Sequence, residues 1–130
     1  MNDIYVKNVL WQAKLAGDGA ANAQVKRIAE LQKNDRSLSF DCGLASIILK
    51  IDGRSSLART LTSLELPYLF VMNVGSKRGV GYSVSLRYDF NLMEGVSGQE
   101  MWIYQSACEA ALPIVLQGLG VDGYVDIRVT

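Results

Sequence analysis

The clearest pattern along the chain is a strict alternation of apolar and polar positions over residues 80–93. Every second residue there is apolar, and the residues between them are glycine or polar. Successive side chains of a β-strand point to opposite faces of a sheet, so this period of two predicts a strand with one buried face. The apolar positions are Val80, Tyr82, Val84, Leu86, Tyr88, Phe90 and Leu92.

Two further segments favour strands. Residues 68–74 are apolar almost without interruption, which is typical of a strand that lies centrally in a sheet or is buried on both faces. The glycines Gly75 and Gly79 bound the connection to the alternating segment, and residues 75–79 therefore predict the turn of an antiparallel hairpin. Residues 121–130 alternate again and predict a C-terminal strand.

Residues 101–119 follow a helical period instead. Their apolar residues recur at spacings of three, four and seven, which predicts an amphipathic helix that ends at Gly118 or Gly120. Pro113 lies inside this segment and has no N–H to donate, so we expect a kink or two abutting helices there. The apolar stripe consists of Met101, Tyr104, Cys108, Ala111, Leu112, Val115 and Leu119.

The first half of the chain has a weaker pattern. Residues 4–15 fit both periods, and we favour a strand, followed by a break at Gly17, Asp18 and Gly19. Residues 22–33 predict an amphipathic helix.

The segments that follow favour extended structure, with one alternative left open. Residues 37–41 and 44–51 look extended, and Asp52 and Gly53 form a turn signal. Residues 55–66 fit either a short helix capped by Ser55 or Ser56, or the second strand of a hairpin.

These elements together predict an α+β fold. We expect a single domain over residues 1–130, built as a two-layer sandwich in which a mainly antiparallel or mixed sheet carries two or three helices on one face. No repeat, linker or biased tract interrupts the order of elements.

The charge and composition of the chain disfavour several classes of partner and of enzymatic activity. The chain has 13 basic and 13 acidic residues, so its net charge is zero and nucleic acid is an unfavoured partner. It contains no histidine, which excludes Ser-His-Asp catalysis and histidine metal sites, and its two cysteines do not form a zinc-binding pattern. We therefore expect no cofactor and no metal, and enzymatic activity is the less favoured interpretation.

The N-terminus has no signal-peptide pattern, and residues 101–121 are too interrupted by polar residues, proline and glycine for a membrane span. We therefore expect a cytoplasmic protein.

Two groups of polar residues are candidate binding residues. Lys77 and Arg78 lie in the turn at 75–79, where they either form a solvated sheet edge or contact an anion or a partner. Arg87 and Asp89 share one side of the strand at 80–93, and Tyr124 and Asp126 share one side of the C-terminal strand. If the two strands are neighbours, these side chains form one polar face.

Trp102 lies beside the apolar stripe of the helix at 101–119, which holds more apolar area than one sheet face requires. This excess predicts a second buried side, such as a subunit interface.

The favoured hypothesis is a small non-catalytic binding or assembly module that forms a homo-oligomer or binds a protein partner, through a long strand edge or the Trp102 side of the helix. One alternative is a small-molecule-binding protein or histidine-independent enzyme that uses the polar face of the sheet. A second alternative is a weak nucleic-acid binder that uses Lys26, Arg27, Lys33, Lys77 and Arg78.

Overall fold

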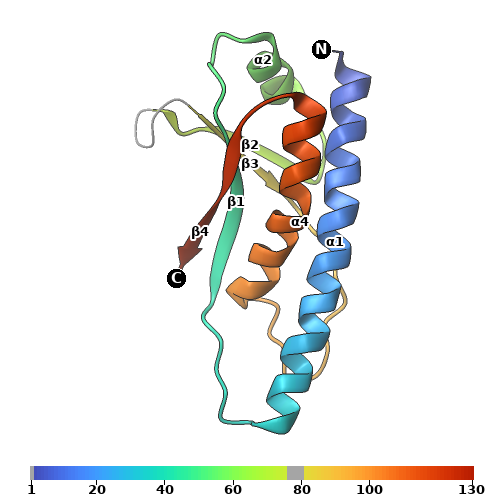
Figure 1. Ribbon diagram of the computed structural model, residues 1–130, viewed down its shortest axis with the longest axis vertical. Helices are drawn as coiled ribbons and strands as arrows, with labels where there is room; N and C mark the ends of the chain where they lie inside the picture. Colours follow the sequence, from blue (N-terminus) through green and yellow to red (C-terminus); the bar gives the residue numbers. More distant parts are fainter. Residues whose placement is uncertain (1, 76–80) are drawn as a thin grey trace.

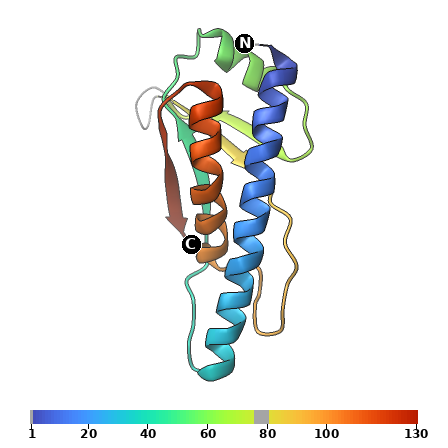
Figure 2. The same ribbon diagram turned by 45° about the vertical axis from the view of Figure 1, so that its right-hand side comes forward.

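Three helices and a four-stranded antiparallel sheet make up the described part of the chain. The computed structural model describes residues 2–75 and 81–130. Its strands lie in the order β2-β3-β1-β4, and each neighbouring pair is antiparallel. Helices α1 and α4 lie side by side against one face of this sheet, and α2 lies at the end where α1 begins (Figures 1 and 2). The elements are α1 (Asp3–Asn34), β1 (Gly43–Leu49), α2 (Ser56–Ser63), β2 (Leu69–Asn73), β3 (Tyr82–Leu86), α4 (Met101–Leu119) and β4 (Gly123–Val129). The predicted α+β class is confirmed, and the sheet is antiparallel throughout.

The hydrophobic core fills the space between the helix pair and the sheet. Each of the elements α1, α4, β1 and β3 contributes side chains that are fully buried, because their apolar positions repeat at the period of the element that carries them. The largest of these side chains are Val6, Leu10, Val25, Ile28, Ile47, Leu49, Val84, Ile103 and Val115.

The predictions for residues 4–19, a strand followed by a break, were wrong, whereas the helix predicted at residues 22–33 is confirmed as part of α1. Residues 4–15 are helical, and the glycines at 17 and 19 do not break the chain, because α1 continues to Asn34. The alternation that favoured a strand competed with a longer helical stripe, which the buried positions now identify. Residues 37–41, which were expected to be extended, belong to no strand. The stripe consists of Val6, Leu10, Ala13, Gly17, Ala21, Val25 and Ile28.

In the described part of the alternating segment, residues 81–93, a strand forms over Tyr82–Leu86, and residue 80 lies outside the described residues. The backbone N–H of Arg87 still donates to the carbonyl of Tyr68 (2.7 Å), which continues the pairing of β3 with the chain before β2. Residues 88–93 then run along α1, where the backbone N–H of Asn91 donates to the side chain of Asn22. The predicted antiparallel pairing with the preceding strand is confirmed, since Val71 lies opposite Val84. The predicted central position of that preceding strand was wrong, because β2 is an edge strand.

The remaining elements follow their patterns closely. Residues 101–119 form one continuous helix with Pro113 inside it, so the alternative of two abutting helices was wrong. Gly120 ends this helix with a φ of 66°, a left-handed conformation that glycine adopts without strain. The strands predicted at residues 44–51 and 121–130 are confirmed, with bounds of 43–49 and 123–129. Of the two alternatives for residues 55–66, the structure has the helix α2.

Ser55 caps α2, and its replacement tests this assignment. Its Oγ accepts a hydrogen bond from the backbone N–H of Ala58 (3.1 Å) and donates one to the carbonyl oxygen of Asp52 (2.7 Å). We expect Ser55→Ala to lower the free energy of unfolding by about 1 kcal/mol, because the N–H group then has no acceptor in the chain. Ser56→Ala is the matched control, with an expected change within about 0.5 kcal/mol. Urea unfolding measures both, and equal effects would show that Ser55 is not the cap.

Candidate functional site

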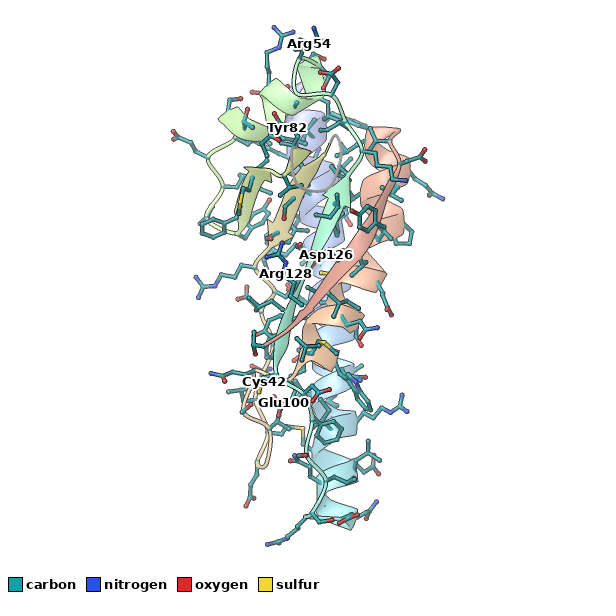
Figure 3. The ribbon with its side chains drawn as sticks, turned by 90° about the vertical axis from the view of Figure 1, so that its left-hand side faces the viewer. Cys42, Arg54, Tyr82, Glu100, Asp126 and Arg128 are labelled. Atoms are coloured by element: carbon teal, nitrogen blue, oxygen red, sulfur yellow. The ribbon has the colours of Figure 1, made fainter. Side chains whose placement is uncertain are left out.

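One face of the sheet has no helix over it among the described residues, and we call it the uncovered face (Figure 3). Residues opposite each other on neighbouring strands share a face, so the register identifies the side chains that line it. At one edge of this face, Phe70 and Met72 on β2 are 71% and 65% exposed. Leu44 on β1 is also exposed, whereas Ile48, near the middle of the face, is buried. The side chains that line the uncovered face are Leu44, Ser46, Ile48, Phe70, Met72, Ser83, Ser85, Tyr124, Asp126 and Arg128.

Polar side chains gather on the β4 side of this face. Arg128 Nε lies 3.3 Å from Asp126 Oδ2, and Figure 3 shows the two residues close together on β4. The ammonium group of Lys50 lies 5.9 Å from the ring centre of Tyr124, within the range of a cation–π contact. Tyr124 and Asp126 therefore lie on one accessible surface, as their alternation predicted.

The other predicted members of the polar face lie elsewhere. The strands β3 and β4 are not neighbours, because β1 lies between them. Ser83 and Ser85 still share the uncovered face with β4, but Arg87 and Asp89 lie beyond the end of β3. Lys77 and Arg78 lie outside the described residues.

The strand β4 forms one edge of the sheet and directs alternate backbone groups away from it. The N–H of Lys50 donates to the carbonyl of Asp122 (2.9 Å), and the N–H of Thr130 donates to the carbonyl of Cys42 (3.0 Å). In an antiparallel ladder every second residue faces the neighbouring strand, so the residues with even numbers face β1. The N–H and C=O groups of Gly123, Val125, Ile127 and Val129 therefore point outward, and no described strand pairs with them. The side chains of Ile127 and Val129 are 39% and 61% exposed.

Asp89 belongs to an ion-pair cluster on α1 instead of the sheet. Lys14 Nζ lies 2.8 Å from Asp18 Oδ2 and 2.9 Å from Asp89 Oδ2, and the lysine side chain is only 6% exposed. Although burial by itself lowers the pKa of Lys14, the hydrogen bonds and charges of Asp18 and Asp89 raise it above its ordinary value. The hydrogen bond from Lys14, together with its charge, lowers the pKa of Asp89.

This cluster fastens the segment after β3 onto α1. Asp18 also accepts a hydrogen bond from the backbone N–H of Asp89 (2.8 Å), and the neighbouring Tyr88 ring packs onto the helix at Gly17. The Tyr88 hydroxyl donates to Cys108 Sγ at 3.8 Å in the core. Burial raises the pKa of the Cys108 thiol to about 11, so this thiol stays protonated at neutral pH. The contacts of the cluster are structural.

Trp102 lines a small hollow at the start of α4. Its ring packs edge-on against Phe40, with ring centres 5.1 Å apart. The hollow has a volume of about 270 Å³ and is also lined by Leu31 and Leu38. Pockets for small molecules begin at roughly 300 Å³, so this hollow is small for a ligand site.

A larger open groove lies at the C-terminal end of α1. Its volume is about 970 Å³, and most of the side chains around it are polar or charged. Both basic and acidic side chains line it, so it offers no concentrated positive charge for a phosphate backbone. The charged residues are Lys26, Glu30, Lys33, Arg36 and Glu94.

The exposed thiol of Cys42 lies where β1 meets the start of α4. Residue 42 forms a β-bridge with Glu100, whose carboxylate accepts hydrogen bonds from the backbone N–H groups of Ser97 (3.0 Å) and Gly98 (2.8 Å). Although burial by itself raises the pKa of Glu100, these hydrogen bonds lower it below its ordinary value. The Glu100 carboxylate therefore stabilises the loop before α4.

Sequence reasoning missed two groups, the Lys14 cluster and Glu100. The sequence does carry a signal for the Lys14 cluster, because Lys14, Asp18 and Asn22 recur every four residues, which places them on one side of a helix. It went unused because the segment around them was interpreted as a strand and a break. The hydrogen bonds of Glu100 depend on the fold of a loop, for which the chain carries no periodic signal.

The described residues carry neither a metal cluster nor a membrane span. In residues 2–75 and 81–130, no three cysteine, aspartate or glutamate side chains lie close enough to hold a metal ion. Of the helices in this part of the chain, none is both long and apolar enough to cross a membrane. Comparison of the chain with protein-family models, with curated proteins and with solved structures found no significant match.

Proposed function

We propose that this chain is a non-catalytic assembly module whose copies associate with one another through the sheet. The observation that carries this proposal is the one-sided cover of the sheet. Among the described residues, α1 and α4 lie on one face of the sheet, and the opposite face and the outer sides of β2 and β4 are left accessible. An edge strand with free N–H and C=O groups is a template for pairing with another chain.

Side chains on the accessible surface support the same proposal. Phe70 and Met72 stand on the edge strand β2, and Ile127 and Val129 stand on the opposite edge strand, so both edges carry exposed apolar area. Association would remove this area from water, at a gain of about 25 cal/mol for each square ångström buried. The zero net charge of the chain means that two copies do not repel each other over a long range.

The two other candidate functions have less support. A small-molecule site is expected to be a largely apolar cavity with a few convergent polar groups, whereas the larger groove is open and mostly polar. Nucleic-acid binding needs a concentrated basic surface, whereas Lys26 and Lys33 share their groove with Glu30 and Glu94. The titratable groups that the fold brings together, such as Lys14 and Asp18, bind to each other.

Light scattering coupled to size exclusion tests the proposal. The protein is measured over a dilution series from about 1 μM to about 100 μM, at about 150 mM and about 1 M salt. We expect a species with at least twice the mass of one chain that persists at both salt concentrations, because backbone pairing and apolar burial are screened little by salt. The mass of a single chain under all conditions would overturn the proposal.

A further inference from the structure

We propose that two copies of this chain pair antiparallel through their β4 edges, around a two-fold axis at Ile127, so that the two sheets become one. This inference rests on the proposed function and specifies its contact. The outward N–H and C=O groups of Val125, Ile127 and Val129 would form the hydrogen bonds between the two β4 strands. Around this axis Ile127 lies opposite Ile127 of the second copy, and Val125 lies opposite Val129 of the second copy.

The charges on β4 select this axis. With the axis at Ile127, Asp126 lies opposite Arg128 of the second copy, and the symmetry repeats this pair. The pair falls at a position without ladder bonds, where opposite Cα atoms are about 4.5 Å apart and side chains approach most closely. Arg128 and Asp126 already contact each other at 3.3 Å within one chain, and both lie on the uncovered face. They therefore lie beside the line along which the two β4 strands would pair, which we call the seam.

Other axes fit the same edge less well. An axis at Asp126 places that carboxylate opposite its own copy, and an axis at Arg128 does the same with two guanidinium groups. Like charges directly opposite each other destabilise a strand pair. An axis at Val125 pairs Arg128 with Asp122, which precedes the first residue of β4. Of these axes, only the one at Ile127 pairs each charged residue of β4, Asp126 and Arg128, with a residue of the other sign in β4 of the second copy.

The other side of the seam supports the same register. The side chains of Val125, Ile127 and Val129 lie on the helix-facing side of β4, and the last two are exposed in a single copy. Pairing places these β-branched side chains opposite one another, an arrangement that β-sheets favour. The edge carries no proline and no bulge that would block pairing.

A charge-swap experiment tests the register. Asp126→Arg places two arginines opposite each other across the seam, and Arg128→Asp places two aspartates there. We expect each variant alone to associate roughly tenfold more weakly than the wild type, or worse. A mixture of the two restores the opposite charges, so we expect a heterodimer with wild-type affinity, measured by native mass spectrometry with one variant mass-labelled. The double variant Asp126→Arg, Arg128→Asp is expected to pair with itself.

A backbone variant provides an independent readout. The N–H of Ile127 points away from β1, so Ile127→Pro removes an intermolecular hydrogen bond and leaves the ladder with β1 intact. We expect a folded single chain by circular dichroism and light scattering, whereas Ile127→Val keeps the association.

Each outcome separates the two proposals. If the wild type associates while the charge variants and Ile127→Pro associate equally well, or the mixture fails to restore the complex, the β4 pairing is wrong and assembly uses another surface. If the wild type is a single chain at every concentration, the proposed function itself is wrong.

Discussion

Gly17→Ala is expected to lower the free energy of unfolding by about 2 kcal/mol, although alanine is the better helix former. A Cβ atom at residue 17 would overlap the ring of Tyr88, which packs against the helix at this point. The ring cannot move away freely, because it is buried and its hydroxyl bonds to Cys108. The cost of displacing the ring therefore exceeds the gain of about 1 kcal/mol in helix propensity.

Gly19→Ala is the matched control on the same helix. A Cβ atom at residue 19 meets nothing within 4 Å, so only the propensity gain remains. We expect this variant to be more stable than the wild type by about 0.5–1 kcal/mol. Chemical unfolding followed by circular dichroism measures both variants. Stabilisation by Gly17→Ala as well would mean that Tyr88 does not pack on α1 as described.

Lys14→Met is expected to lower the free energy of unfolding by about 2 kcal/mol. The substitution keeps the length and apolar stem of the side chain but removes the cation that Asp18 and Asp89 share. Removal of one member of a buried ion pair costs roughly 3–5 kcal/mol, and we expect less here because Asp89 is 76% exposed and keeps its hydration. Lys7→Met, an exposed site on the same helix, is the control and is expected to change little.

The pH dependence of this difference follows from the pKa shifts. The pKa of Asp89 is lowered in the folded state, so its contribution is present above the ordinary aspartate pKa and is lost as pH falls through the folded value. The pKa of Lys14 is raised, so its contribution is present below 10.5 and is lost as pH rises through the folded value. The stability gap between wild type and Lys14→Met should therefore be widest near neutral pH and narrow at both extremes. A gap that stays constant from acid to alkaline pH would contradict the ion-pair cluster.

Much of the second half of the fold was predictable because its signals are local. Residues 101–119 and 123–129 have one dominant period each, and each period matches the element that forms. Ser55 was one of two candidate caps in one of the two alternatives left open for residues 55–66, and it caps α2 in the structure. These elements depend on their own residues more than on distant ones.

The first helix was not predictable in the same way. Two glycines within three residues suggested a break, and only the contact between Gly17 and Tyr88, 71 positions apart, explains why one of them lies in the middle of a helix. The alternation at 80–93 was similarly misleading beyond Leu86. The segment after it leaves the sheet because Asp18 and Asn22 bind its backbone, a contact that no local pattern encodes.

The candidate site was predicted in part. Tyr124 and Asp126 lie on the uncovered face as the alternation of the C-terminal strand implied, whereas Asp89 lies in the Lys14 cluster. Which strands form the edges depends on the strand order, which is set by contacts between distant segments. The outward groups of β4 could therefore be identified only from the folded chain.

Amide hydrogen exchange, measured by NMR at low and high protein concentration, tests assembly through β4 most directly. The amides of Tyr124, Asp126 and Arg128 face β1 and should be protected at both concentrations. Assembly through the β4 edge predicts that the amides of Val125, Ile127 and Val129 exchange freely at low concentration and become protected at high concentration. Exchange at these three amides that does not depend on concentration would contradict it.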